Sequence, residues 1–175
     1  MKEARVMQSI PPLNEGERFI LGIDGLSRSG KTTLAKNLEP LLQERFHPWF
    51  VFHMDDYIVE WEKRYLTGHE PWYEYYYLQW DVEALTRDLF QPMREKGLGL
   101  PDTAGIIVEG VFLQREEWCR YFDYVIYLQW PRQERFQRES EETRKKQEKF
   151  KERYWKAEDY YLQTVKPETK ANLVL

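Results

Sequence analysis

The sequence predicts an α/β fold built on a five-stranded parallel sheet that is flanked by helices. Short apolar runs typical of buried strands alternate with segments of helical spacing. A glycine-rich loop follows the first run, and charged residues follow the next two where each strand should end. Parallel strands joined by right-handed crossovers bring their carboxyl ends to one edge, where ligands bind. We therefore expect the chemistry at that edge.

The expected strands are five apolar runs: Phe19–Asp24, Phe50–Met54, Gly105–Glu109, Tyr124–Gln129 and Ala171–Leu175. Helical spacing predicts helices over Lys31–Arg45, Val82–Glu95 and Gln114–Tyr121. The highly charged stretch Arg132–Thr164 should also be helical, continuous or broken. The aromatic cluster Pro71–Tyr77 could form a lid or pack in the core.

The composition indicates one soluble domain over residues 1–175. A chain of 175 residues can bury a sizeable core, and no apolar run approaches the roughly 20 residues of a membrane span. The net charge of −4 implies no broad nucleic-acid surface. Cys119 is the only cysteine, which excludes an internal disulfide and suits a reducing cytoplasm.

Residues Gly25–Thr32 fit G-x-x-x-x-G-K-[ST], the P-loop, between a strand-like run and a helix-like segment. Its backbone N–H groups and the helix dipole can bind phosphate. Lys31 should reach the β- and γ-phosphates, and the Thr32 hydroxyl should ligate Mg²⁺. An ordinary glycine turn is the alternative. The expected nucleotide-binding residues are Gly25, Leu26, Ser27, Arg28, Ser29, Gly30, Lys31, Thr32 and Thr33.

Carboxylates follow the second and third expected strands, on the same edge as the P-loop. Asp55 is the candidate catalytic base, because it could face both Mg²⁺ and an acceptor hydroxyl. The alternative is that Asp55 and Asp56 only start a turn, and which of them points inward is open. Glu109 should order the Mg²⁺ shell, unless it is a solvated strand end. The expected metal site is thus Thr32, Asp55 and Glu109.

Arg132, Arg135 and Arg138 are three residues apart and share one helical face. Such arginines could close over the phosphates and stabilise the transferring charge. We expect a helical lid over about residues 131–150, in which Arg135 and Arg138 act with Lys31 in catalysis. A solvated charged helix is the competing interpretation.

Trp80 and Asp81 form a candidate acceptor site. A carboxylate accepts two hydrogen bonds, which suits a vicinal diol, and the adjacent ring offers a flat stacking face. Core packing is the alternative for Trp80, and capping of the following helix is the alternative for Asp81.

A second functional hypothesis comes from Asp102–Gly105, which fits the D-x-x-G switch of GTPases. This element should follow a strand, yet here it precedes one, and no N-K-x-D motif is present. His53, inside an expected strand, should be packed or hydrogen-bonded.

These motifs resemble the uridine kinase and nicotinamide riboside kinase family over nearly the whole chain. Residues 22–38 resemble its P-loop, and Met54–Tyr57 resembles the segment whose first aspartate, here Asp55, is the base. Residues 77–82 resemble a stretch whose aspartate holds ribose hydroxyls. Ile107–Leu113 resembles the acidic strand end, and two lid arginines match Arg135 and Arg138.

The resemblance implies a P-loop kinase fold and transfer of the γ-phosphoryl group of ATP, with Mg²⁺, to the 5′-hydroxyl of a nucleoside. It implies that Tyr57, Trp80 and Asp81 bind this substrate. The expected partner is a small nucleoside-like acceptor, with no nucleic acid or membrane. The nearest alternative is a kinase for another small alcohol, of nicotinamide riboside or pantothenate type.

Two departures from the family concern base specificity. Uridine kinases carry a substrate hairpin before the acidic strand, and Gly97–Ala104 leaves no room for it. We therefore predict that a mobile hairpin is missing between Gly97 and Asp102. A genuinely short connection, with a wider acceptor pocket, is the alternative. The sequence also stops inside the last expected strand, where the family continues into a loop near adenine.

Overall fold

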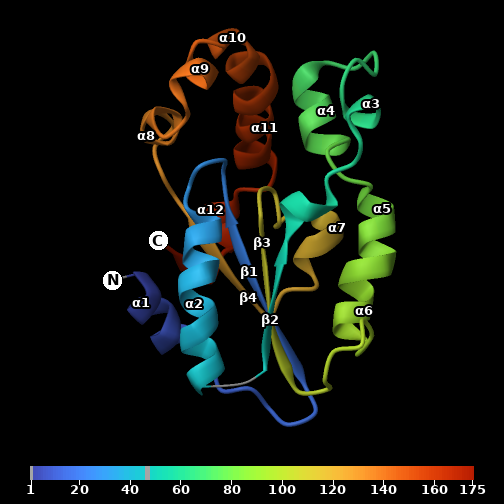
Figure 1. Cartoon of the computed structure of the whole chain (residues 1–175), viewed down its shortest axis with the longest axis vertical. Helices are drawn as coiled ribbons and strands as arrows, with labels where there is room; N and C mark the ends of the chain where they lie inside the picture. The colour runs from blue at the N-terminus through green and yellow to red at the C-terminus, as the bar shows by residue number, and fades with distance from the viewer. Residues whose placement is uncertain (1, 46–47) are drawn as a thin grey trace.

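The computed structural model describes residues 2–45 and 48–175. A five-stranded parallel sheet with the order β2-β3-β1-β4-β5 lies at its centre (Figure 1). This confirms the predicted α/β fold. The strands are β1 (Arg18–Gly25), β2 (Trp49–His53), β3 (Ala104–Gly110), β4 (Tyr124–Leu128) and β5 (Leu173–Val174).

The sheet is buried on both faces, which explains why its strands read as continuous apolar runs. Neighbouring residues of β1 point to opposite faces: Ile20 belongs to one core cluster and Leu21 to the other. On the Leu21 side the sheet packs against helix α2 (Lys31–Arg45), through residues such as Leu38. On the Ile20 side the core is rich in aromatic rings, among them Trp118.

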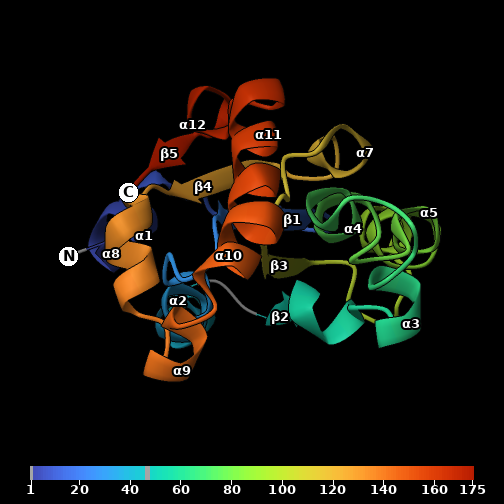
Figure 2. The same cartoon turned by 90° about the horizontal axis from the view of Figure 1, so that it is seen from above.

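The helices cover both faces of this sheet (Figures 1 and 2). Helix α1 (Lys2–Ser9), which the sequence patterns did not predict, packs beside α2 through the buried Val6. In the described part of the chain, no helix is long and apolar enough to cross a membrane. The other face carries α5 (Val82–Leu85), the π-helical turn η2 (Thr86–Phe90), α6 (Gln91–Arg94) and α7 (Glu116–Cys119).

The charged stretch 132–164 is helical but broken. Ser140 starts a new helix by accepting a hydrogen bond from the Thr143 N–H at 3.1 Å, which ends the preceding helix. The pieces are α8 (Arg132–Gln137), α9 (Glu141–Arg144), α10 (Gln147–Lys149), the π-helical turn η3 (Phe150–Trp155) and α11 (Lys156–Thr164), followed by α12 (Pro167–Lys170). We call residues 131–150 the lid segment.

A second group of elements rises beside the lid segment at the carboxyl edge of the sheet (Figure 1). It comprises the 3₁₀ turn η1 (Met54–Tyr57), α3 (Trp61–Arg64) and α4 (Pro71–Tyr77). Arg153 of η3 joins the two groups: its guanidinium donates to the Glu74 carboxylate of α4 at 2.8 Å, and both side chains are buried. The cluster Pro71–Tyr77 therefore forms a packed helix that borders the space below the lid segment.

The connection between α6 and β3 is short and tightly held. The buried Arg18 guanidinium donates to the carbonyl oxygens of Gly97, Leu100 and Pro101 at 2.7–3.1 Å. It also donates to the Pro92 and Met93 carbonyls at the end of α6. These hydrogen bonds hold the connection in place, and the missing hairpin stays a prediction.

The D-x-x-G sequence lies on the wrong edge for a switch. Thr103 Oγ1 accepts a hydrogen bond from the Gly16 N–H at 2.8 Å, just before β3 begins. The P-loop lies at the opposite, carboxyl edge, a strand length of about 20 Å away. Asp102–Gly105 therefore cannot contact a nucleotide on the P-loop, and the GTPase interpretation of this segment is wrong.

Candidate active site

The P-loop connects β1 to α2 in a conformation that depends on its glycines. A Cβ atom on Gly25 would come within 2.6 Å of Ser29 Oγ and 2.9 Å of the Leu128 carbonyl oxygen. Gly30 has a φ of +96°, which residues with side chains rarely adopt. The two glycines let the loop curl tightly around an opening. The backbone N–H groups of the loop can point into that opening.

Lys31, the first residue of α2, is only 8% exposed. Its Nζ donates to the Leu26 carbonyl oxygen at 3.0 Å. Burial lowers the pKa of Lys31, and the nearby Glu109, Asp24 and Asp55 carboxylates oppose that effect. The ammonium group thus lies at the wall of the cavity with acidic side chains around it.

The strand register places the Glu109 carboxylate beside the P-loop. Glu109 of β3 is aligned with His53 of β2. Its Oε1 accepts a hydrogen bond from Thr32 Oγ1 at 2.9 Å and lies 2.7 Å from His53 Nδ1. The structure thus shows His53 hydrogen-bonded, as expected, and it brings Thr32 and Glu109 together.

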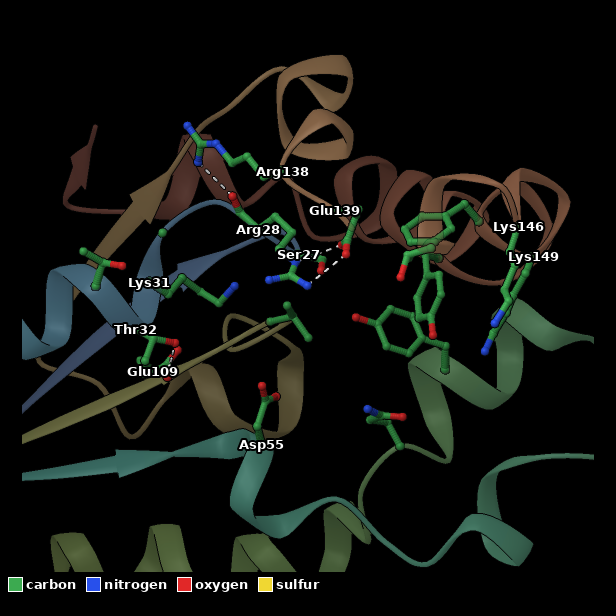
Figure 3. A pocket seen from close by; sticks show the side chains of 18 residues that line it. Ser27, Arg28, Lys31, Thr32, Asp55, Glu109, Arg138, Glu139, Lys146 and Lys149 are labelled. Carbon is green, nitrogen blue, oxygen red and sulfur yellow. Dashed lines mark hydrogen bonds and ion pairs between the residues drawn. The ribbon is translucent and has the colours of Figure 1, made fainter. Parts of the chain in front are cut away.

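Asp55 faces this group across the cavity. In Figure 3 its carboxylate points into the open space opposite Lys31. Asp55 lines the cavity whereas Asp56 does not. Burial, and next the Glu109 carboxylate, raise the pKa of Asp55. Asp55 is therefore the inward-facing member of the Asp55–Asp56 pair.

Thr32, Asp55 and Glu109 fit the chemistry of a Mg²⁺ site. A hydroxyl and two carboxylates supply the hard oxygen ligands that Mg²⁺ prefers. Desolvation is the main cause of the raised pKa of Asp55 and the nearby Glu109 carboxylate is the second, and a divalent cation would offset the repulsion between the two carboxylates. Among the described residues there is no cluster of three or more His, Cys, Asp or Glu placed to hold a metal. Mg²⁺ bound through few protein groups, phosphates and water matches that arrangement.

Asp24 is a buried site residue that the sequence patterns did not single out. Its carboxylate accepts hydrogen bonds from the Gly25 N–H at 2.8 Å, Gln114 Nε2 at 3.0 Å and the Tyr161 hydroxyl at 2.6 Å. Burial raises the pKa of Asp24. This network ties the start of the P-loop to the segment between β3 and α7 and to α11, which explains how the loop is held.

The expected catalytic arginines contact the P-loop backbone. Arg135 is 5% exposed and forms two bonds to Glu158, at 2.8 and 2.9 Å, and a third to the Ser27 carbonyl oxygen at 2.8 Å. Arg138 lines the cavity, but it donates to the Arg28 carbonyl oxygen at 2.9 Å, and its guanidinium points away from Lys31 in Figure 3. In this structure both arginines therefore brace the loop, and their contact with phosphate stays a prediction.

The expected acceptor residues do not line the cavity. Trp80 is 2% exposed, and its Nε1 donates to the Met54 carbonyl oxygen at 2.8 Å. Asp81 caps α5 by accepting from the Ala84 N–H at 2.9 Å. Tyr57 packs against the same core as Trp80. Trp80 is thus packed in the core and Asp81 caps a helix, as the alternatives stated, and their contact with an acceptor stays a prediction.

Other residues line the part of the cavity beyond the P-loop and the acidic groups. The cavity has a volume of about 800 Å³. They come from α4, the loop after it, the lid segment and η3, which the fold brings together (Figure 3). No motif marks them, because they come from segments that are separate in the sequence. They are Tyr75, Gln79, Glu139, Thr143, Lys146, Lys149, Phe150 and Tyr154.

Comparison with known proteins agrees with this geometry. The sequence matches the AAA domain family over residues 21–156. A solved structure described as a possible uridine kinase from Bacillus stearothermophilus is 44% identical with a TM-score of 0.81, over 98% of this chain and 94% of that chain. The chain belongs to the uridine kinase-like family of P-loop kinases.

A second solved structure, which has lower sequence identity to this chain, supports the fold alone. It is a candidate fructose transport system kinase from a Silicibacter species, 17% identical, with a TM-score of 0.68 over 98% of this chain and 94% of that chain. A comparison with curated proteins gave no match.

The buried ion pair that braces the P-loop of this kinase predicts a large stability effect. Glu158→Gln removes the partner of the buried Arg135 guanidinium. Breaking a buried pair by removing one partner costs about 3–5 kcal/mol. We expect the free energy of unfolding, measured with urea, to fall by that order. Glu148→Gln, in an exposed pair with Lys151, is the control and should change it by less than about 1 kcal/mol. Equal effects would contradict the bracing role.

Trp80 and Asp81 should behave as a core residue and a helix cap. We expect Trp80→Ala to lower the free energy of unfolding by about 3–5 kcal/mol and Asp81→Ala by about 1 kcal/mol. The KM for the acceptor should be unchanged in Asp81→Ala. A raised acceptor KM with unaltered stability in this variant would instead support direct substrate binding.

Proposed function

We propose that the protein transfers the γ-phosphoryl group of ATP to a hydroxyl group of a small-molecule alcohol. The observation that carries the proposal is one cavity lined by Lys31, Thr32, Asp55 and Glu109 at the carboxyl edge of the sheet. The 5′-hydroxyl of a nucleoside is the acceptor group that the family relationship suggests. Phosphoryl transfer needs a loop that binds phosphate, hard oxygen ligands for a metal ion and a carboxylate that faces the acceptor. The cavity combines all three.

Each residue has a role that follows from its position. The loop N–H groups and Lys31 hold the phosphates and stabilise charge that develops during transfer. Thr32 and Glu109, with Asp55, would hold Mg²⁺, which when bound neutralises phosphate charge and orders the transferred group. Asp55 faces the position of the acceptor and takes the proton of its hydroxyl.

The test is ADP release from Mg²⁺ and ATP with a panel of nucleosides and other small alcohols. We expect ADP to form at an appreciable rate only when both Mg²⁺ and an acceptor are present, together with a phosphorylated product detectable by mass spectrometry. Rapid hydrolysis of GTP without any acceptor would overturn the proposal.

A further inference from the structure

The active-site cavity has two ends of different chemistry. The P-loop end is built for the nucleotide phosphates, as described above. The other end lies under the lid segment, beyond Asp55, and includes Gln79, Tyr154, Lys146 and Lys149. Figure 3 shows both lysine side chains on the side of the cavity away from Lys31. An acceptor whose hydroxyl meets Asp55 must extend toward this second end.

Positive charge at the P-loop end is largely matched by acidic groups. Lys31 lies among carboxylates, including Asp55 and Glu109. Arg28 forms a two-bond pair with Glu139, at 3.0 and 2.9 Å. We therefore assign the P-loop end of the cavity to the nucleotide phosphates and their metal ion.

The second end carries surplus positive charge. No acidic side chain in the described part of the chain pairs with Lys149, whose ammonium lies over the rings of Tyr65 and Tyr154 at 5.4 and 5.9 Å. Lys146 has only a long contact with Glu142, at 3.6 Å, between exposed side chains. Such exposed pairs contribute little, so both ammonium groups are available to a ligand.

Tyr65, one of the two rings beside Lys149, lies among several cationic side chains. Tyr65 is stacked under the Arg153 guanidinium at 3.9 Å and lies near Arg64, at 4.9 Å. Burial acts to raise the pKa of Tyr65, yet this pKa is lowered, because Arg153, a hydrogen bond with Tyr154, and then Lys149 and Arg64 favour the phenolate. Glu74 pairs with Arg153, and the remaining cations have no such buried partner among the described residues.

We propose that the acceptor carries an anionic group, a carboxylate or a phosphate, at the end opposite its reacting hydroxyl, and that Lys146 and Lys149 bind this group. The proposal rests on the kinase function proposed above and specifies the class of its substrate. Lysine ammonium groups suit either anion, since they act as point charges without a fixed geometry. Because both lysines belong to the lid segment, binding of the anion draws this segment over the reacting hydroxyl and excludes water there.

Matched pairs of acceptors test the proposal. Each pair differs by one anionic group: orotidine with uridine, pantothenate with pantothenol, and ribose 5-phosphate with ribose. We expect kcat/KM for the anionic member of at least one pair to exceed that of its neutral partner by about tenfold or more. The pair that responds tells a carboxylate from a phosphate. Equal or higher values for the neutral member of every pair that reacts would overturn the proposal and leave the kinase function intact.

The double variant Lys146→Gln/Lys149→Gln identifies the residues. We expect KM for the preferred anionic acceptor to rise about tenfold and KM for ATP to stay the same. The control is Lys145→Gln/Lys151→Gln, in which the lysines belong to exposed pairs with Glu141 and Glu148, and it should behave as wild type. A raised KM for ATP with an unchanged acceptor KM would assign the lysines to the nucleotide and overturn the proposal.

A binding measurement separates this inference from the proposed function. The melting temperature of wild type should rise with the anionic member of the responding pair more than with its neutral partner. The double variant should lose that difference. This result, obtained without any ADP release, would support the anion site while refuting the kinase proposal. Melting shifts that are the same for both members of every pair would refute the anion site.

Discussion

Asp55→Asn should reduce kcat/KM for phosphoryl transfer by about 10²–10⁴-fold, the usual contribution of a positioned general base. The amide keeps the shape of the side chain, but it cannot accept the proton of the acceptor hydroxyl and is a weaker ligand for Mg²⁺. Because the structure gives Asp55 a place on the cavity wall at the end of β2, the variant should stay folded. The measurements are ADP release with the best acceptor and the Kd for ATP, which should be largely unchanged.

The adjacent aspartate supplies the control. Asp56 belongs to the same turn but does not line the cavity. Asp56→Asn should therefore keep kcat/KM within a few-fold of wild type. A greater loss in Asp56→Asn than in Asp55→Asn would show that the base has been assigned to the wrong carboxylate.

Lys31→Ala should lower kcat by about 10²–10³-fold, since removing one preorganised group that stabilises transition-state charge commonly has an effect of this size. Lys31 is buried at the cavity wall, where its ammonium group donates to the Leu26 carbonyl oxygen of the P-loop. The rate of ADP release at saturating ATP and acceptor measures the effect.

Lys36→Ala, on the exposed side of the same helix, is the matched control for Lys31→Ala. It removes an equal charge from α2 and should leave kcat within about twofold of wild type. The melting temperatures of both variants show whether either is misfolded. Normal turnover by a folded Lys31→Ala variant would refute the assigned role of the P-loop.

Much of the fold could be predicted because buried parallel strands leave a simple pattern. The apolar runs near Ile20 and Ile107 located β1 and β3 to within one residue at each end. The helix expected over Val82–Glu95 appears as α5, η2 and α6. The break at Ser140 was harder to predict, because charged residues on both sides of it have good helix propensity and the cap competes locally.

The site residues also divide into those that could be predicted from the sequence and those that could not. Asp55 and Glu109 could be chosen because each directly follows or ends a strand, and strand ends converge whatever the rest of the chain does. The placement of Trp80 could not be settled from the sequence, since stacking on a ligand and packing in a core need the same flat ring. Tyr154 reaches the cavity through the packing of η3 against α4, and Lys149 lies in the short helix α10 directly before η3. No local pattern records that packing.

The strand order has a consequence for how the chain acquires its nucleotide site. β1, which delivers the P-loop, is the central strand, and its neighbours are Ala104–Gly110 on one side and Tyr124–Leu128 on the other. Neither neighbour is close in sequence, so the contacts that fix β1 have a high loop-closure cost and form late. During synthesis the P-loop segment leaves the ribosome long before either partner, with apolar residues of β1 still uncovered. A nascent chain that ends before β4 lacks one of the two strands that hold β1, so we expect nucleotide to stabilise this protein only after β4 has been made.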